Sequence, residues 1–143
     1  MRASAEIVVE RPRASVWEWA TNPEHWERWQ GDVSAEMAGD RITTRYAYGD
    51  ETGVAEYEVA ESTPPRIHTV RSVSGPYRFE GTLELFEHVG GTRVRQTAVV
   101  GPKDALSRVV FVVAWPLVHR SMRRRIRTQL ERLKTMVELE AAL

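Results

Sequence analysis

One histidine and a group of tyrosines are the residues of this 143-residue chain best suited to acid–base chemistry. An imidazole with a pKa near neutrality can take a proton from the carbon beside a carbonyl group, which is the step that an aldol closure requires. A tyrosine hydroxyl can orient a carbonyl oxygen by donating a hydrogen bond while its ring lines a cavity. We therefore take His68 and Tyr57 as candidate catalytic residues. The alternative for His68 is an imidazole hydrogen-bonded within the fold, without turnover.

Other chemistries lack their sequence signatures. Because the chain has no cysteine, it has no thiol nucleophile, disulfide or Cys-based metal site. The four histidines are far apart and no HExxH spacing occurs, so we expect no metal site. No G-x-S-x-G elbow or glycine-rich phosphate loop is present, and we expect no cofactor. Basic and acidic residues number 20 each, so we expect no nucleic-acid partner.

The elements that must position the candidate residues follow from the hydrophobic period along the chain. Residues 5–10 centre on the β-branched Ile7-Val8-Val9 and predict a strand, while Pro12 and Asn22-Pro23 predict the starts of two short helices. From residue 32 to residue 100 the period becomes two, and five turn sequences predict six further strands. After Gly101-Pro102 the pattern is helical to the end of the chain.

Pairing the strands across these turns places one set of side chains on a single face. The turns predict Tyr46 opposite Tyr57, Val59 beside His68, and His68 opposite Gly81. With Gly90-Gly91 as a turn, Leu85 lies opposite Gln96, and Gly39-Asp40 sets Met37 opposite Ile42. The residues predicted to share this face are Val33, Ala35, Met37, Ile42, Thr44, Tyr46, Tyr48, Ala55, Tyr57, Val59, His68, Val70, Ser72, Tyr77, Phe79, Leu83, Leu85, Val94, Gln96, Ala98 and Val100.

The opposite face of the predicted sheet is charged and therefore solvated, with Arg45 expected opposite Glu58 and Glu56 opposite Arg71. The first face needs a cover, and the C-terminal helix offers an apolar stripe at helical spacing. The stripe consists of Trp115, Met122, Ile126, Leu130, Leu133 and Val137.

The covered face mixes hydroxyl, imidazole and amide groups with its apolar side chains. Burying such a group without a partner costs about 1–3 kcal/mol, so several on one face favour a cavity that holds a ligand. The alternative is that each is a satisfied polar residue of the core. The candidate ligand-binding residues are Trp26, Trp29, Thr44, Tyr46, Tyr48, Tyr57, His68, Ser72, Tyr77, Phe79, Gln96, Trp115, His119 and Met122.

The element order and several motifs resemble the START/Bet v 1-like (SRPBCC) helix-grip superfamily, including its polyketide cyclase/dehydrase family. The motifs are Ile7-Val8-Val9 with Pro12 and Val16-Trp17, Trp26 and Trp29, Tyr57-Glu58-Val59 before Pro64-Pro65, Gly90-Gly91-Thr92-Arg93-Val94, and Leu130-Glu131-Arg132-Leu133-Lys134 followed by Glu138. The resemblance implies one α+β domain over residues 1–143. In it a curved antiparallel sheet of about seven strands wraps around the long C-terminal helix, with two short helices after strand 1.

The same resemblance implies a hydrophobic cavity between sheet and helix that holds a lipid, a quinone or a polyketide-like molecule. Residues 7–26 look particularly like aromatase/cyclases, which use an arginine together with aromatic residues in the pocket. Here Glu61 stands where that arginine would sit, Arg71 is expected to point outward, and Arg66 lies at the sheet edge. We therefore place a binding protein first and a polyketide cyclase/dehydratase second. An interaction protein of the ribosome- or coenzyme-Q-associated type, using the arginines of 120–127, comes third.

The start of the C-terminal helix is apolar nearly all round from Val109 to Trp115, and Pro116 predicts a kink or a restart. Five arginines follow within 120–127. We favour an apolar segment that closes the pocket mouth or forms a dimer contact, followed by a solvated arginine face, over peripheral contact of 109–127 with an anionic membrane.

The longest apolar run has ten residues, and the N-terminus lacks the apolar region of a secretory signal. We therefore expect a cytoplasmic protein, monomeric or homodimeric. Only Lys103 and Lys134 among the 20 basic residues are lysine, a skew that fits a GC-rich bacterial genome.

Overall fold

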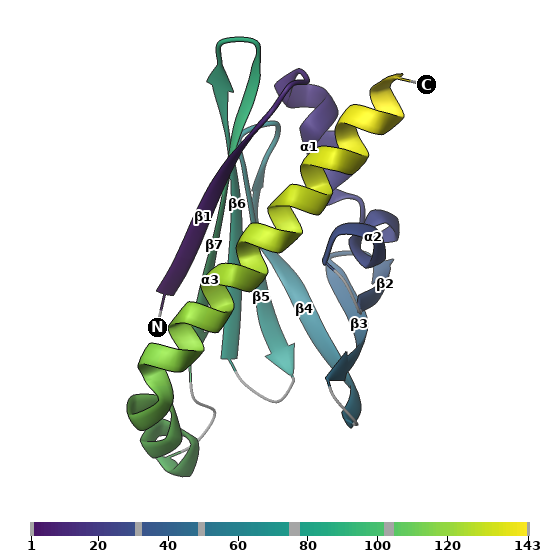
Figure 1. The fold of residues 1–143 in the computed structure, drawn as a ribbon. Helices are drawn as coiled ribbons and strands as arrows, with labels where there is room; N and C mark the ends of the chain where they lie inside the picture. The colour runs from purple at the N-terminus through teal and green to yellow at the C-terminus, as the bar shows by residue number, and fades with distance from the viewer. Residues whose placement is uncertain (1, 31–32, 49–50, 75–77, 102–104, 143) are drawn as a thin grey trace.

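A seven-stranded antiparallel sheet curves around one long helix in the computed structural model (Figure 1). The structure describes residues 2–30, 33–48, 51–74, 78–101 and 105–142, without the side chains of 30, 33, 46–48, 51–52, 105–108, 110–111 and 141–142. The elements are β1 (Arg2–Val9), α1 (Arg13–Thr21), the 3₁₀ helix η1 (Pro23–His25), α2 (Trp26–Gln30), β2 (Val33–Ala38), β3 (Arg41–Tyr48), β4 (Glu51–Thr63), β5 (Ile67–Ser74), β6 (Arg78–His88), β7 (Gly91–Gly101) and α3 (Ala105–Ala142). The strand order is β1-β7-β6-β5-β4-β3-β2. The predicted α+β helix-grip fold is confirmed.

The two short helices begin where proline chemistry predicts. Pro12 precedes α1, and its carbonyl accepts the first helical hydrogen bond from the Val16 amide at 3.1 Å. Asn22 caps the next segment, since its side-chain oxygen accepts from the Glu24 amide at 3.0 Å. That segment opens as η1 and continues as α2, which brings Trp26 and Trp29 into the core.

The predicted register is confirmed at one hairpin. Ala38 pairs with Arg41 and Met37 with Ile42, so the turn is Gly39-Asp40. Gly39 has φ +65°, a conformation that glycine adopts without steric cost.

At the next two hairpins the predicted register is wrong. Tyr57 lies opposite Ile42 rather than Tyr46, because β3 and β4 are already paired at Tyr48 and Glu51. Between β4 and β5, Val59 pairs with Val70 and not with His68. An irregularity after Val59 shifts the pairing again, which places His68 opposite Ser62.

The register is also wrong on both sides of β6. His68 lies opposite Leu83, and Gly81 lies opposite Val70. Between β6 and β7 the predicted turn is displaced by one residue, because His88 pairs with Gly91 and only Gly90 of that turn takes a positive φ, +81°. Leu85 therefore faces Val94 rather than Gln96, and Gln96 faces Leu83.

The pairs predicted on the charged face of the sheet are displaced along the strands as well. Glu58 lies between Arg41 on β3 and Arg71 on β5, instead of opposite Arg45. Except at His68, which the irregularity after Val59 places opposite Ser62 and so three residues from its predicted partner, these errors are an even number of residues. Because side chains alternate with a period of two, even errors leave the predicted faces unchanged.

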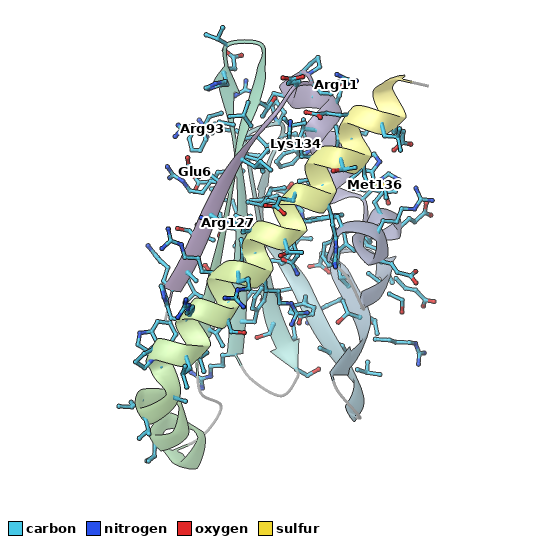
Figure 2. All side chains as sticks on the ribbon, viewed as in Figure 1. Glu6, Arg11, Arg93, Arg127, Lys134 and Met136 are labelled. Carbon is cyan, nitrogen blue, oxygen red and sulfur yellow. The ribbon has the colours of Figure 1, made fainter. Side chains whose placement is uncertain are left out.

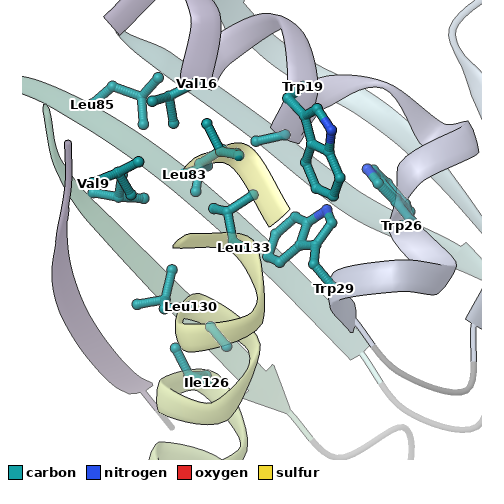
Figure 3. Packing of buried hydrophobic residues seen from close by; sticks show 14 of the residues in the cluster. Val9, Val16, Trp19, Trp26, Trp29, Leu83, Leu85, Ile126, Leu130 and Leu133 are labelled. Carbon is teal, nitrogen blue, oxygen red and sulfur yellow. The ribbon is translucent and has the colours of Figure 1, made fainter. Parts of the chain in front are cut away.

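The core lies between the covered face and the C-terminal half of α3 (Figure 3). Ile126, Leu130, Leu133 and Val137 are each no more than 5% exposed, which confirms this part of the predicted stripe. Full burial of such a side chain contributes about 1.5–3 kcal/mol. The other members that pack in this cluster include Val9, Val16, Trp19, Trp29, Leu83, Leu85 and Val94.

Polar contacts fix the C-terminal end of α3 to the junction of β1 and α1. The Glu138 carboxylate accepts hydrogen bonds from the Glu10 amide at 2.9 Å and from Lys134. Arg11 donates to the Glu138 carbonyl at 2.7 Å, and Arg11 and Lys134 lie at the same end of the molecule in Figure 2. The Lys134 hydrogen bond, followed by that of the Glu10 amide, lowers the pKa of Glu138.

The N-terminal end of α3 extends past the sheet. The helix continues through Pro116 without a break, and Figure 1 shows its first turns set at an angle to the rest. The predicted kink fits this path, whereas a restart of the helix does not occur. Over the described residues, no helix combines the length and apolar character needed to cross a bilayer.

Replacing Gly91 by alanine should destabilise the fold, because a Cβ there would overlap the Val9 carbonyl oxygen and lie 3.0 Å from the Glu10 Cα. Both atoms belong to backbone, which cannot move without separating β1 from β7. We expect Gly91→Ala to lower the free energy of unfolding by about 2 kcal/mol or more in urea denaturation.

The matched control is Gly101→Ala at the other end of β7, where the nearest atom would be the Arg78 Cβ at an ordinary 3.7 Å. This variant should stay within about 0.5 kcal/mol of the wild type. Equal stabilities for the two variants would contradict the close approach at Gly91.

Candidate functional site

A cavity of about 180 Å³ lies between the covered face of the sheet and α3. Its walls come from α2, from the five strands β3 to β7, and from the middle of the helix. The lining residues are Trp26, Thr44, Ala55, Tyr57, Val70, Phe79, Gln96, Ala98, Val100, Met122, Arg125, Ile126 and Gln129.

Aromatic rings make up much of the apolar wall. The rings of Tyr57 and Phe79 meet edge to face, with centroids 5.9 Å apart and an interplanar angle of 82°. Gly81 leaves room for the Phe79 ring, since a Cβ at this position would lie 3.0 Å from Phe79 Cε1. The same Cβ would lie 3.4 Å from the Gln96 side-chain nitrogen, so Phe79, Gly81 and Gln96 together shape one part of the wall.

Two polar side chains of the lining have unused hydrogen-bonding capacity. The Gln96 carboxamide and the Arg125 guanidinium form no hydrogen bond or ion pair with any side chain that the structure describes. Thr44 differs, because its hydroxyl donates to the Ala55 carbonyl at 3.2 Å. The cavity therefore has an amide on its sheet side and a cation on its helix side, both available to a bound molecule.

The indole nitrogen of Trp26, on the α2 side of the cavity, is a third hydrogen-bond donor. Trp26 is 5% exposed, and its indole nitrogen is buried without a hydrogen-bond partner in the described structure. A buried donor left unpaired costs about 1–3 kcal/mol, so an acceptor brought close to Trp26 would be stabilised. The Trp29 indole nitrogen is likewise buried and unpaired, but Trp29 packs in the core and not in the cavity lining.

The structure brings together six of the predicted ligand-binding residues: Trp26, Thr44, Tyr57, Phe79, Gln96 and Met122 all line the cavity.

Other predicted residues lie outside the lining. The Ser72 hydroxyl accepts a hydrogen bond from the Phe79 amide at 2.9 Å. Trp115 and His119 contact one another, with ring centroids 5.1 Å apart. The side chains of Tyr46 and Tyr48, and the whole of Tyr77, fall outside the described residues.

His68 is half-buried away from this cavity. Its ring packs against the edge of Trp17, with centroids 5.6 Å apart, and its Nδ1 lies 3.2 Å from the Ser62 hydroxyl. Burial lowers the pKa of His68, because an apolar environment disfavours the charged imidazole. Since Leu83 rather than Gly81 stands opposite His68, the open space expected beside the imidazole is not there. Its catalytic role stays a prediction.

Sequence reasoning missed the two polar residues that α3 contributes to the cavity. The sequence predicts Arg125 on a solvated arginine face and assigns no role to Gln129. The available signal is their spacing, since Met122, Arg125, Ile126 and Gln129 follow one another at i, i+3, i+4 and i+7. A search for an apolar stripe alone passes over polar members of the same helix face.

A second, more open hollow of about 280 Å³ lies beside α1 and the end of α3. Trp19 and His25 stack there, with centroids 4.4 Å apart. The Trp19 indole donates to Glu140, and the His25 Nδ1 hydrogen-bonds the Trp19 carbonyl at 2.8 Å. These groups already have partners, which makes this hollow the weaker candidate. Within the described ranges, no three His, Cys, Asp or Glu residues are placed to hold a metal ion.

Comparison with protein families gives a match to the model described as "Polyketide cyclase / dehydrase and lipid transport", over residues 1–138. No curated protein matches the chain. The chain is similar in structure to TTHA0849 from Thermus thermophilus, with a TM-score of 0.78, 22% identity and full coverage of both chains.

Two further similar structures carry an activity in their description. The di-domain ARO/CYC StfQ from the steffimycin biosynthetic pathway has a TM-score of 0.79 and 10% identity, over 99% of this chain and 52% of that one. The Zhui aromatase/cyclase from a Streptomyces species has a TM-score of 0.72 and 12% identity, over 96% and 93% of the two chains. At these identities the likeness establishes the fold alone.

The environment of His68 predicts its titration. Because burial disfavours the imidazolium, the ring should titrate below its ordinary value of 6.5 and be neutral at pH 7. The chemical shift of the His68 ring protons, followed by NMR against pH, measures this directly. A midpoint above 6.5 would contradict desolvation as the dominant influence and would require a nearby negative charge.

Proposed function

Because the chain belongs to the polyketide cyclase / dehydrase and lipid transport family, we propose that it binds a hydrophobic, partly oxygenated small molecule between the sheet and α3. The observation that carries the proposal is the combination of aromatic and aliphatic walls with a few unpaired polar groups. This combination is typical of small-molecule sites, where apolar surface supplies affinity and polar groups fix the orientation.

Each part of the cavity suggests a part of the ligand. Tyr57, Phe79 and Met122 offer apolar contact to a ring or a short chain. Gln96 would donate its amide hydrogens to a carbonyl oxygen within the molecule. Arg125, whose side chain is exposed at one side of the cavity, would pair with an acidic or oxygen-rich end.

The size of the cavity limits how a ligand can sit. About 180 Å³ is below the roughly 300–1,000 Å³ of pockets that enclose a drug-sized molecule. A lipid, quinone or polyketide-like molecule would therefore place one end inside and extend past Arg125. Met122 can widen the space, because an unbranched thioether changes rotamer at low cost.

Binding should be measurable with anilinonaphthalene sulfonate, a fluorescent probe that pairs an anionic group with apolar rings. We expect Ala55→Phe, which fills the cavity, to abolish binding, and Arg125→Gln to weaken it about tenfold, the loss expected for one charge-assisted hydrogen bond. In parallel, native mass spectrometry of the purified protein should show one small molecule per chain, released by organic extraction.

Arg123→Gln is the matched control for Arg125→Gln, because it removes the same charge from the same helix outside the cavity lining. Equal weakening by both arginine variants would show that only overall charge matters. Unchanged binding to Ala55→Phe would place the probe elsewhere and overturn the proposal.

The alternative function is a polyketide cyclase/dehydratase, which the family description and the two aromatase/cyclase structures support. An aldol closure needs a base to remove a proton beside one carbonyl and a donor to protonate the other carbonyl's oxygen. Tyr57 could serve as the donor. Among the described residues, the lining contains no carboxylate or imidazole to act as the base, and His68 stands outside it, which is why we place binding first.

Incubation with a linear poly-β-ketone separates the two functions. If the protein only binds, the rate of ring formation followed by liquid chromatography and mass spectrometry should equal the uncatalysed rate. Faster formation of a cyclised, dehydrated product, slowed at least tenfold by Tyr57→Phe or His68→Ala, would establish the alternative.

A further inference from the structure

The N-terminal part of α3 carries an exposed apolar surface. Val109, Val112, Val113 and Leu117, which we name the tip patch, are 62%, 66%, 78% and 77% exposed. Their spacing of i, i+3, i+4 and i+8 places them on one side of the helix. This part of α3 extends beyond the sheet (Figure 1), so the fold itself leaves the patch uncovered. Exposed valine and leucine side chains gathered in this way usually mark an interaction site.

Arginines continue the same side of the helix. Arg120, Arg123, Arg124 and Arg127, which we name the arginine collar, are all exposed, and helical spacing sets them in line with the tip patch. None forms an ion pair with a carboxylate in the part of the chain that the structure describes. From residue 105 to residue 130 the sequence contains no acidic residue, so this end of α3 is strongly cationic although the whole chain is neutral.

The tip patch and the arginine collar follow one another directly along the helix. Arg120 lies three residues after Leu117, which corresponds to about 4.5 Å along a helix. An interfacial helix buries its apolar side about 5–10 Å into the boundary between headgroups and acyl chains. With the tip patch at that depth, the arginine collar would lie among the phosphates.

Other kinds of partner would complement either the tip patch or the arginine collar, but not both. In a dimer formed through this surface, each arginine collar would face either the other collar or the apolar tip patch. Neither surface offers an acidic residue to neutralise the arginines. A nucleic acid would pair with the collar and leave the tip patch in water. An anionic bilayer supplies both an apolar phase and negative charge.

We propose that the first half of α3 docks this protein onto an anionic membrane surface, with the tip patch inserted and the arginine collar on the lipid phosphates. The docking goes beyond the proposed ligand binding and does not depend on it. It does add a route for a ligand, because Met122, Arg125 and Ile126 of the cavity lining lie on the helix segment that would touch the bilayer.

Vesicle flotation tests the docking. The wild-type protein should float with mixed phosphatidylglycerol–phosphatidylcholine vesicles and not with pure phosphatidylcholine vesicles, and added salt should release it. The double variants Val113→Gln/Leu117→Gln and Arg120→Gln/Arg124→Gln should each reduce the bound fraction at least tenfold.

Matched controls lie elsewhere on the surface. Arg41→Gln/Arg45→Gln removes two exposed charges from the outer face of the sheet, and Val89→Gln replaces a valine that is 97% exposed at a hairpin turn. Both should float like the wild type. Circular dichroism and urea unfolding confirm that each variant folds.

Three results would overturn the docking. They are the absence of flotation with anionic vesicles, an equal loss of vesicle binding in the sheet-face control, and a tip-patch variant that only converts a dimer to a monomer.

Anilinonaphthalene sulfonate binding should survive in the tip-patch and collar variants. Loss of probe binding in Ala55→Phe with flotation intact therefore separates the cavity from the docking surface.

Discussion

The burial of one sheet face beneath the C-terminal half of α3 is the interaction on which the rest of the structure depends. Ile126, Leu130, Leu133 and Val137 are almost completely removed from water. Their spacing of i, i+4, i+7 and i+11 keeps them on the side of α3 that faces the sheet. The contacts of Glu138 with Glu10 and Lys134 hold the end of the helix in place. The short helices α1 and α2 add Val16, Trp19 and Trp29 to this cover. Because an antiparallel sheet needs its apolar face covered to be stable, the strands depend on α3 lying across them.

The cavity forms where the side of α3 that faces the sheet no longer consists of large apolar side chains alone. Toward the N-terminus the stripe continues as Met122 and Ile126, but Arg125 and Gln129 share that side of the helix. Facing them, the strands present small residues such as Ala55 and Ala98. A long side chain on either surface would fill the space, so the cavity results from what both surfaces lack. Such open space leaves the Gln96 carboxamide and the Arg125 guanidinium without a hydrogen bond to any side chain in the described part of the chain.

The length of α3 gives one helix two separate environments. Its C-terminal half is held against the core, whereas its first turns extend beyond the sheet with the tip patch in water. Exposed apolar surface has a cost in solvation that a monomer would ordinarily avoid. Placing the arginine collar between the tip patch and the core separates the segment that could meet a membrane from the segment that holds the fold together.

The sequence by itself determined the elements, the fold class and which residues share a face, because these depend on local chemistry and on a period of two. Turn residues located the strands, Pro12 and Asn22 marked the helix starts, and the errors of register were an even number of residues except at the irregularity after Val59. Only the tertiary structure decided the partners across the sheet. A displaced turn residue or one bulge moves each pair along the strand, and no local signal records it. For this reason His68 lies opposite Leu83 rather than Gly81, and Arg125 joins the cavity only because α3 crosses the sheet at that point.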